Sequence, residues 1–489
     1  MSLFRIAFVT ALVAVSSPAT AEDSLVADAA ERGDASMVAA LLGSGQAADA
    51  AQPDGMTALH WAARHGDAAI TRQLIAAGSS VNVENRYGIR PLHLACQTGN
   101  PEVVRQILEA GADSNAELAG GETPLMIASR TGRGEPVRLL ISRGAKVDAV
   151  ERQGQTALMW AAAEGNTEAV AELLKAGADP GRSLASGFNA FFFAVREGRL
   201  PVVKQLLAAG VDVNQPLRPR SKDPKKSTTA LILAVENGHF ELAAALLDAD
   251  ARPMDHPAGY TALHALAWVR KPIRGDGDPP PQGSGTLSSL DMVRRLVAAG
   301  ADVNARLARG ESGRGRLTTN GATPFFLASR TADTEFMQLL LDLGADPTLT
   351  NNDGSSPLLA AAGVGALGDG DEAAATELET LEAIKLLLKL GADVNSVDAN
   401  GETAMHGAAY QDRPAVIRFL AEQGADIAVW NRENKWTWTP WLIAEGHRPG
   451  NFRPAPASIA ALDEVMRASG VIPPPPRPRK PVKVEYSAP

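Results

Sequence analysis

Four histidines are the first residues to test for chemistry, because imidazole nitrogens that converge can hold a transition metal. His60, His93, His264 and His406 each lie three residues after a position that opens a similar apolar segment. Since this segment recurs along the chain, the histidines mark one repeated position and are not expected to meet at a metal. We therefore predict no metal site.

Residues 363–368, with the sequence GVGALG, match the glycine pattern of a dinucleotide-binding loop. That loop needs a strand before it and a helix after it. Here the preceding residues have the pattern of a helix that is ending. The match is therefore interpreted as a false positive, and no cofactor is predicted.

Cys96 is the only cysteine, which excludes an intramolecular disulfide. It takes a position that is small elsewhere in the recurring segment, as at Ala63, Ser129 and Ala162. We interpret it as a buried structural thiol and not as a nucleophile. No Ser/His/Asp or Cys/His set stands out, so no catalytic residue is predicted.

The positions that open these segments define a period. Thr57, Arg90, Thr123, Thr156 and Asn189 follow one another at intervals of 33 residues. Such a period indicates one supersecondary unit used many times. A pair of large aliphatic residues recurs with the same period, at 41–42, 74–75, 107–108, 140–141, 173–174 and 206–207.

Each repeat predicts two helices. The Thr57 hydroxyl can cap the first, which ends near Gly66, a residue able to adopt the left-handed conformation of a helix terminus. The second runs over about 68–77 and buries Leu74 and Ile75. It stops at Gly78, and a stretch rich in Asp and Asn returns the chain to the next repeat.

The motifs TALHWAA at 57–63, TPLM at 123–126 and GADVN at 300–304 resemble the ankyrin repeat. The resemblance extends over almost all of the chain after residue 21. It implies an all-α solenoid of about twelve helix-turn-helix repeats joined by hairpin fingers, in which the recurring histidine ties neighbouring repeats by hydrogen bonds. The expected opening positions are Ser24, Thr57, Arg90, Thr123, Thr156, Asn189, Thr229, Thr261, Thr323, Ser356, Thr403 and Thr439.

Residues 1–21 have the pattern of a secretory signal peptide, with Arg5, an apolar stretch and an Ala-Thr-Ala cleavage site. The apolar stretch is shorter than the roughly 20 residues that span a bilayer. We expect cleavage before Glu22, export to the periplasm or the medium, and no membrane span in the mature chain. The solenoid is expected over 22–470 and a proline-rich tail over 471–489.

The formal net charge of −9 argues against general binding to nucleic acid. Two insertions lengthen fingers, at 216–227 and 305–320, and both are basic. We predict that they recognise an acidic protein surface, with solvated loops as the alternative. Their basic residues are Arg218, Arg220, Lys222, Lys225, Lys226, Arg306, Arg309, Arg314 and Arg316. Two further insertions, at 271–289 and 366–378, fall between the helices of their repeats and are interpreted as spacers.

The family resemblance places partner contacts at the finger tips and on the exposed side of the first helices. Carried over to this chain, it selects Arg64, Gln97, Arg130 and Arg196, which share one repeat position. Trp430, Trp436 and Trp438 lie close together near the C-terminal end. They are predicted either to cover the end of the last repeat or to form a binding hot spot.

These residues predict a non-catalytic, monomeric scaffold in the cell envelope. It is expected to be of the exported bacterial type and to bind a protein partner through its concave face and fingers. Two alternatives stay open: an accessory or protective subunit of an exported enzyme, and a secreted effector that binds a host protein.

Overall fold

A computed structural model of the chain describes residues 24–217, 227–272, 281–308, 317–366, 375–447 and 453–475. These residues form helices and connecting loops, with one isolated antiparallel bridge between Leu217 and Thr228. The helices make twelve antiparallel pairs and one additional short helix, so the all-α repeat architecture predicted from the sequence is confirmed. The chain divides by contacts into an N-terminal unit and a C-terminal unit, and the division falls within α11 and α12.

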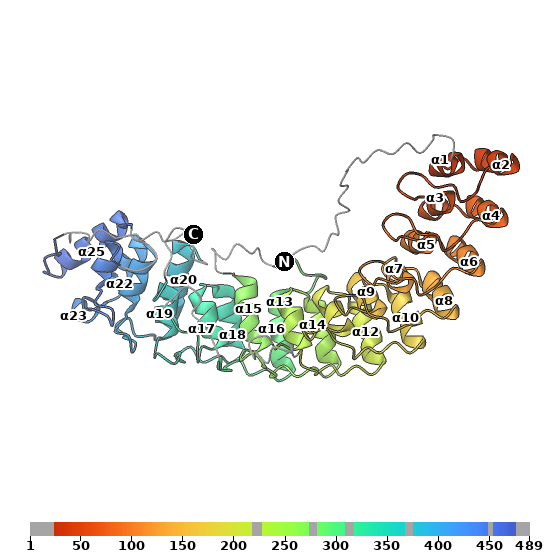
Figure 1. The fold of residues 1–489 in the computed structure, drawn as a ribbon. Helices are drawn as coiled ribbons and strands as arrows, with labels where there is room; N and C mark the ends of the chain where they lie inside the picture. Colours follow the sequence, from red (N-terminus) through yellow and green to blue (C-terminus); the bar gives the residue numbers. More distant parts are fainter. Residues whose placement is uncertain are drawn as a thin grey trace. The chain divides into compact units, whose positions relative to one another are not determined.

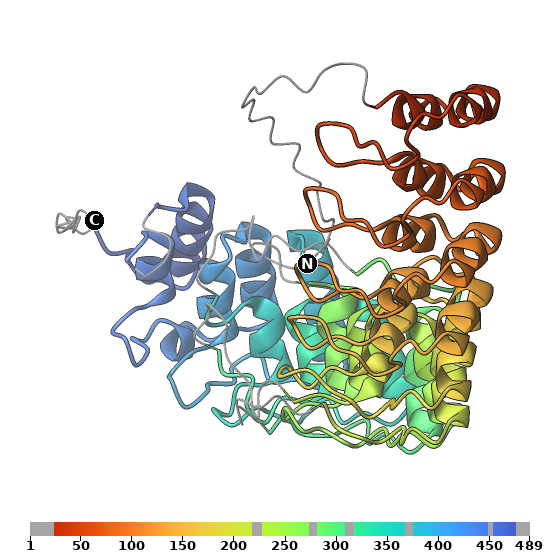
Figure 2. The same ribbon diagram turned by 45° about the vertical axis from the view of Figure 1, so that its right-hand side comes forward.

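The N-terminal unit stacks its helix pairs in two rows (Figure 1, Figure 2). The first helix of each pair packs on the first helices of its neighbours, and the second helices do the same. We call these the first row and the second row. The first row contains α1 (Leu25–Glu31), α3 (Ala58–His65), α5 (Pro91–Thr98), α7 (Pro124–Ser129) and α9 (Ala157–Glu164). The second row contains α2 (Ala35–Gly43), α4 (Ala68–Ala76), α6 (Pro101–Glu109), α8 (Gly134–Ser142) and α10 (Thr167–Lys175).

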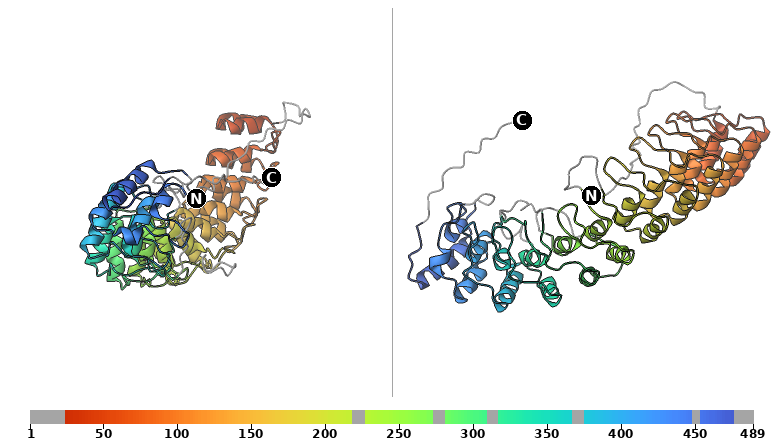
Figure 3. Two further views of the ribbon diagram at one scale, coloured as in Figure 1. Left: turned by 90° about the vertical axis from the view of Figure 1, so that its left-hand side faces the viewer. Right: turned by 90° about the horizontal axis from the view of Figure 1, so that it is seen from below.

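The next pair, α11 (Ala190–Arg196) and α12 (Leu200–Ala208), is divided between the two units. The C-terminal unit then continues the paired arrangement, as Figure 3 shows from two further directions. Its first row contains α13 (Ala230–Glu236), α15 (Ala262–Arg270), α17 (Pro324–Arg330), α19 (Pro357–Ala362), α21 (Ala404–Tyr410) and α24 (Pro440–Ala444). Its remaining helices are α14 (Phe240–Asp248), α16 (Ser289–Ala298), α18 (Thr334–Asp342), α20 (Glu377–Lys389), α22 (Pro414–Glu422), the short α23 (Ile427–Trp430) and α25 (Pro456–Ala468).

Helix starts follow the local chemistry of the opening residue. The Thr123 hydroxyl accepts a hydrogen bond from the backbone N–H of Met126, and proline follows at the first helical position. At positions 90 and 189 another residue replaces threonine, and only one of these two residues caps its helix. Asn189 Oδ1 accepts from the Phe192 N–H at 3.0 Å and so caps α11. Arg90 provides no side-chain cap, and its guanidinium instead pairs with Glu84 at 2.9 Å.

The core of each repeat lies between the two rows. Leu74, Leu140 and Leu173 are fully buried, whereas the residues that follow them, Ile75, Ile141 and Leu174, retain partial exposure. Cys96 is fully buried, and this burial raises the pKa of its thiol. The interpretation of Cys96 as a structural residue agrees with this placement.

Neighbouring repeats are joined by two recurring polar bridges. In the first, His60 Nδ1 accepts from the Thr57 N–H at 3.2 Å, so Nε2 carries the proton and donates to the Ile89 carbonyl at 2.9 Å. His93 and His264 reach Ala116 and Ala322 in the same way. The role that the family resemblance assigned to these histidines is thereby confirmed for His60, His93 and His264. His406 caps its own helix through Nδ1, but its Nε2 makes no such hydrogen bond among the described residues.

The second bridge uses the asparagine of the GADVN motif. Asn304 donates to the Gly344 carbonyl at 3.2 Å and accepts from the Asp346 N–H at 2.8 Å, which joins it to the following repeat. Asn82, Asn115, Asn214 and Asn395 make the same pair of bonds. A primary amide suits this position because it donates and accepts at once.

The insertions between helices are anchored where the structure describes them. The hydroxyl and N–H of Thr286 both donate to Glu241, at 2.8 and 2.7 Å, and Ser284 contacts His239. Lys271 Nζ forms an ion pair with Glu379 at 2.8 Å. The described ends of the first insertion therefore bond to other repeats, and Glu379 directly follows the second insertion. The interpretation of both insertions as spacers stays a prediction.

Candidate interaction surface

The residues selected for partner contact on the first helices do lie on one face. Arg64, Gln97 and Arg130 are exposed on α3, on α5 and at the end of α7, one repeat apart in the N-terminal unit. We call this repeat position the arginine position. In the next repeat the arginine position is occupied by Ala163, which the sequence analysis did not select. The first repeat has Glu31 there, and its carboxylate accepts a hydrogen bond from Gln52 at 2.7 Å.

Three arginines at this position lie over an aromatic ring. The Arg64 guanidinium is 5.4 Å from the ring centre of Trp61, and that of Arg130 is 5.2 Å from Trp160. In the C-terminal unit, Arg196 lies 5.1 Å from Phe188. Cation–π contacts of this kind hold the charged group in place without neutralising it.

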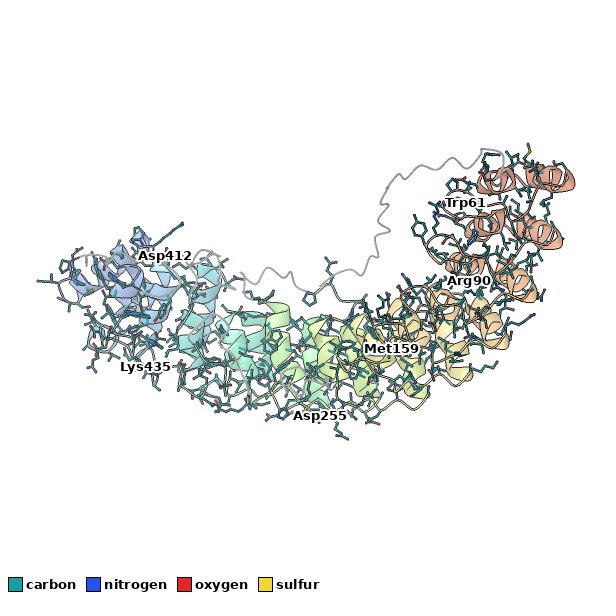
Figure 4. The ribbon with its side chains drawn as sticks, viewed as in Figure 1. Trp61, Arg90, Met159, Asp255, Asp412 and Lys435 are labelled. Carbon is teal, nitrogen blue, oxygen red and sulfur yellow. The ribbon has the colours of Figure 1, made fainter. Side chains whose placement is uncertain are left out.

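Two of these rings, Trp61 and Trp160, belong to a row of apolar residues that sequence reasoning missed. We call it the apolar row; its members are spaced by the same 33 residues and are Trp61, Leu94, Ile127, Trp160 and Phe193. Trp61, Ile127 and Trp160 keep part of their surface exposed, whereas Leu94 and Phe193 are buried. Figure 4 shows Trp61 and Arg90 on the finger side of the first-row helices. The signal was available in the sequence, since the row precedes the arginine position by three residues.

Hydrogen bonds orient the two tryptophans. Trp61 Nε1 donates to Gln52 Oε1 at 2.7 Å, and Trp160 Nε1 donates to Gln155 Oε1 at 2.9 Å. With its N–H satisfied by a finger residue, each ring can turn a face to the arginine. The first-row surface is therefore preorganised, with charged and apolar groups side by side.

The second row has a different electrostatic character, because its charges pair with one another. Arg105 on α6 bonds Glu135 on α8 at 2.6 Å, and Arg72 on α4 lies 3.8 Å from Glu102 on α6. Arg138 adds a contact with Glu135. By contrast, Arg64 has no acidic partner in the part of the chain that the structure describes, and Arg130 reaches only Glu164, at 3.9 Å. Positive charge thus stays available at Arg64, whereas Arg130 makes an ion pair about as long as that between Arg72 and Glu102.

The fingers stand beside one another and are joined through their backbones. The Arg86 N–H donates to the Asp54 carbonyl at 3.0 Å, and the Arg152 N–H donates to that of Gly120 at 2.8 Å. At the tip of one finger, the Tyr87 side chain is 68% exposed. This tip extends the exposed surface beyond the first-row helices.

The described residues on either side of the two basic insertions pair with each other. Leu217 and Thr228 pair at the base of one, and Leu307 pairs with Ala322 at the base of the other. Arg306 is exposed and donates to the Gly321 and Thr350 carbonyls, so it holds its stem to the next finger. The remaining predicted basic residues lie outside the described residues: Arg218, Arg220, Lys222, Lys225, Lys226, Arg309, Arg314 and Arg316.

The tryptophans near the C-terminal end separate into two groups. Trp430 is 1% exposed, so its proposed place in a binding site is not supported, because its ring is packed in the core. Trp441 is also buried, and its Nε1 donates to Asp463 of α25 at 2.9 Å. Trp436 and Trp438 stack 6.1 Å apart on a finger and stay partly exposed. For these two, partner contact stays a prediction.

The C-terminal unit has different residues at the arginine position. Glu236 accepts a hydrogen bond from the Tyr260 hydroxyl at 2.6 Å, and its burial raises the pKa of the carboxyl group. Trp268, Arg330 and Gly363 follow at the same position in the next three repeats. The arginine position of these four repeats therefore holds four different residue types and has a single arginine, Arg330.

Among the residues that the structure describes, no group of three or more His, Cys, Asp or Glu side chains could hold a metal ion. Nor does any described helix combine the length and the apolar character that crossing a membrane requires.

Comparison with known proteins identifies the family. The model for ankyrin repeats in three copies matches residues 26–118, 114–183, 191–272 and 372–448, and the single ankyrin repeat matches residues 320–352. The chain therefore belongs to the ankyrin repeat family, whose repeats generally mediate protein–protein interaction.

Curated relatives match parts of the chain. The chain is 29% identical over 236 residues to the B-cell lymphoma 3 protein homolog of Mus musculus, which covers 48% of this chain and 43% of that protein. It is 32% identical over 179 residues to the human Ankyrin repeat and SOCS box protein 6, covering 36% and 34%. It is 35% identical over 75 residues to the Potassium channel AKT1 of Arabidopsis thaliana, covering 15% and 8%. The chain thus spans less than half the length of each of these relatives.

Proposed function

We propose that this protein is a non-catalytic scaffold that holds a protein partner against the first-row face of its N-terminal unit. The observation that carries the proposal is the contrast between the rows. The second row pairs its own charges, whereas the first row presents Arg64 and Arg130 over partly exposed tryptophan rings. Aromatic residues and arginine are the groups that dominate protein interfaces.

The partner that fits this face has an acidic surface with apolar side chains between its carboxylates. Acidic groups would meet the arginine position, and apolar groups would meet the exposed parts of Trp61, Ile127 and Trp160. The basic insertions at 216–227 and 305–320 would add attraction for the same partner. We propose that the protein acts as a monomer.

The proposed location is the cell envelope of a bacterium, in the periplasm or after secretion. Support comes from residues 1–21, which lie outside the described residues and have the pattern of a signal peptide. Mass spectrometry of the protein from its source cells should give a first residue of Glu22. A chain that retains residues 1–21 and stays in the cytoplasm would contradict this location.

Site-specific photo-crosslinking tests the binding face. A photoreactive residue at position 97 or 130, on the first row, should link one defined protein in the source cells. The matched controls on the second row are position 105, which is partly exposed, and position 138, which is exposed. Linking of the same protein with equal yield from both rows, or no linking from the first row, would contradict the proposed face. The identity of the linked protein then separates an adaptor from a subunit of an exported enzyme.

A further inference from the structure

Arg330 is an arginine that the fold leaves without a partner. It is the last residue of α17, at the arginine position of its repeat, and α17 packs against α15 and α19. Its side chain is partly buried, and desolvation lowers the pKa of the guanidinium with no acidic group opposing the shift. In the described chain, no side-chain hydrogen bond or ion pair involves Arg330, and its nitrogens are not among the fully buried atoms that lack a partner. The guanidinium is therefore recessed but still reaches solvent.

Two other arginines in the same unit show that a buried or partly buried guanidinium is otherwise paired with oxygen acceptors. Arg270 forms ion pairs with Asp333 at 2.7 Å and Glu335 at 3.0 Å. Arg413 donates to the carbonyl groups of Thr376 and Ala375 at 2.9 and 2.6 Å. Leaving a desolvated charge unpaired costs free energy, and the cost is recovered only when an anion arrives.

The positions that flank Arg330 cannot supply that anion. At the arginine position, the preceding repeat has Trp268 and the following repeat has Gly363. Two repeats before Arg330, Glu236 is already bonded to Tyr260. Gly363 has no side chain, and Trp268 has an aromatic ring, so neither neighbouring repeat has an acidic group at this position.

We propose that Arg330 is the docking point for a carboxylate that the protein partner inserts into the first-row face of the C-terminal unit. A guanidinium binds a carboxylate through two parallel hydrogen bonds, which fixes orientation as well as adding affinity. This inference rests on the proposed scaffold function. It adds a specific ionic contact in the second unit to the face described for the first.

The direct test follows the Nε–H signal of Arg330 by NMR, assigned by its loss in Arg330→Lys. Three peptides serve as probes: polyglutamate with an amidated C-terminus, a neutral Gly/Ser peptide with a free C-terminus, and the same neutral peptide amidated. The Arg330 signal should shift saturably with one of the first two and stay constant with the third. A shift with polyglutamate indicates a side-chain carboxylate, and a shift with the free C-terminus indicates a terminal carboxylate. The signals of Arg270 and Arg413, which are already paired, should not move. No shift with either carboxylate peptide, or an equal shift with the amidated neutral peptide, overturns the proposal.

A variant separates binding from structure. Arg330→Met keeps an unbranched apolar side chain and removes the partly buried charge, so the free protein should melt at a higher temperature. Its affinity for the active carboxylate peptide should fall by about tenfold, the loss expected for one charge-assisted contact. Arg413→Met is the control and should lower the melting temperature. If Arg330→Met lowers it too, Arg330 has a structural role and the proposal fails. In that case the crosslinks from positions 97 and 130 decide the scaffold function separately. If they persist, the scaffold function is still supported although the Arg330 proposal has failed.

Discussion

At the scale of single residues, the recurring histidines show how a side chain that could bind a metal or transfer a proton instead has a structural role. His264 and His406 are buried, and desolvation lowers the pKa of each imidazole to about 4. Each ring is neutral at pH 7, with Nδ1 accepting the backbone N–H three residues earlier. A neutral ring suits the bridge, whereas protonation of Nδ1 would break its bond to the backbone.

These shifts make stability depend on pH. The folded-state pKa lies below the ordinary value of 6.5, so the unfolded chain takes up protons first as the pH falls. The stabilisation is complete above pH 6.5 and is lost as the pH falls towards 4. Per histidine, the free energy of unfolding should decline by up to about 1.4 kcal/mol per pH unit in this window. Urea unfolding at pH 7, 6 and 5 measures the slope. The variant His406→Gln should show a shallower slope, and equal slopes would contradict the assignment.

At the scale of elements, the asparagine bridges show why the repeats stack in register. Asn115 donates to the Gly144 carbonyl at 2.9 Å and accepts from the Lys146 N–H at 2.8 Å. One repeat later, Asp148 keeps only the accepting bond, to the Asp179 N–H at 3.2 Å. A carboxylate has no proton to donate at neutral pH, so one bond of the bridge is lost there.

This natural difference gives a pair of opposite predictions. Asp148→Asn should restore the donor towards the next repeat and stabilise the N-terminal unit by about 0.5–1.5 kcal/mol. Asn115→Asp should destabilise the unit by a similar amount or more. Chemical unfolding of both variants beside the unchanged protein measures the two effects. Changes of the same sign in both variants would show that the bridge does not set the stacking energy.

Much of the fold followed from the sequence at this scale, because capping residues, aliphatic pairs and terminal glycines are local signals. Thr57, Thr123 and Thr439 each precede a helix where the period placed them. The insertions were less predictable, since the bond between Thr286 and Glu241 joins residues from different repeats. The burial of Trp430 was also hidden, because clustered tryptophans suit a core and an interface equally well.

At the scale of the whole molecule, the net charge is negative although some segments are locally basic. The chain has a net charge of −9, yet the two finger insertions concentrate basic residues. A variant with Glu at positions 218, 220, 314 and 316 should capture the crosslinked partner more weakly, and the loss should shrink at high salt. Its melting temperature should stay unchanged, because these insertions extend from the finger stems. Unchanged capture would remove the insertions from the binding surface.

The ion pair between Lys271 and Glu379 connects the flanks of two insertions that belong to repeats 8 and 10. Lys271 holds the pKa of Glu379 down to about 2, and the same carboxylate also caps α20 through Thr376. Deleting residues 271–289 would remove Lys271 and leave the Glu379 carboxylate without its ion pair, which would weaken the start of α20 far along the chain. An engineer who shortens this insertion should therefore keep Lys271 or replace Glu379 with Gln, which needs no cation.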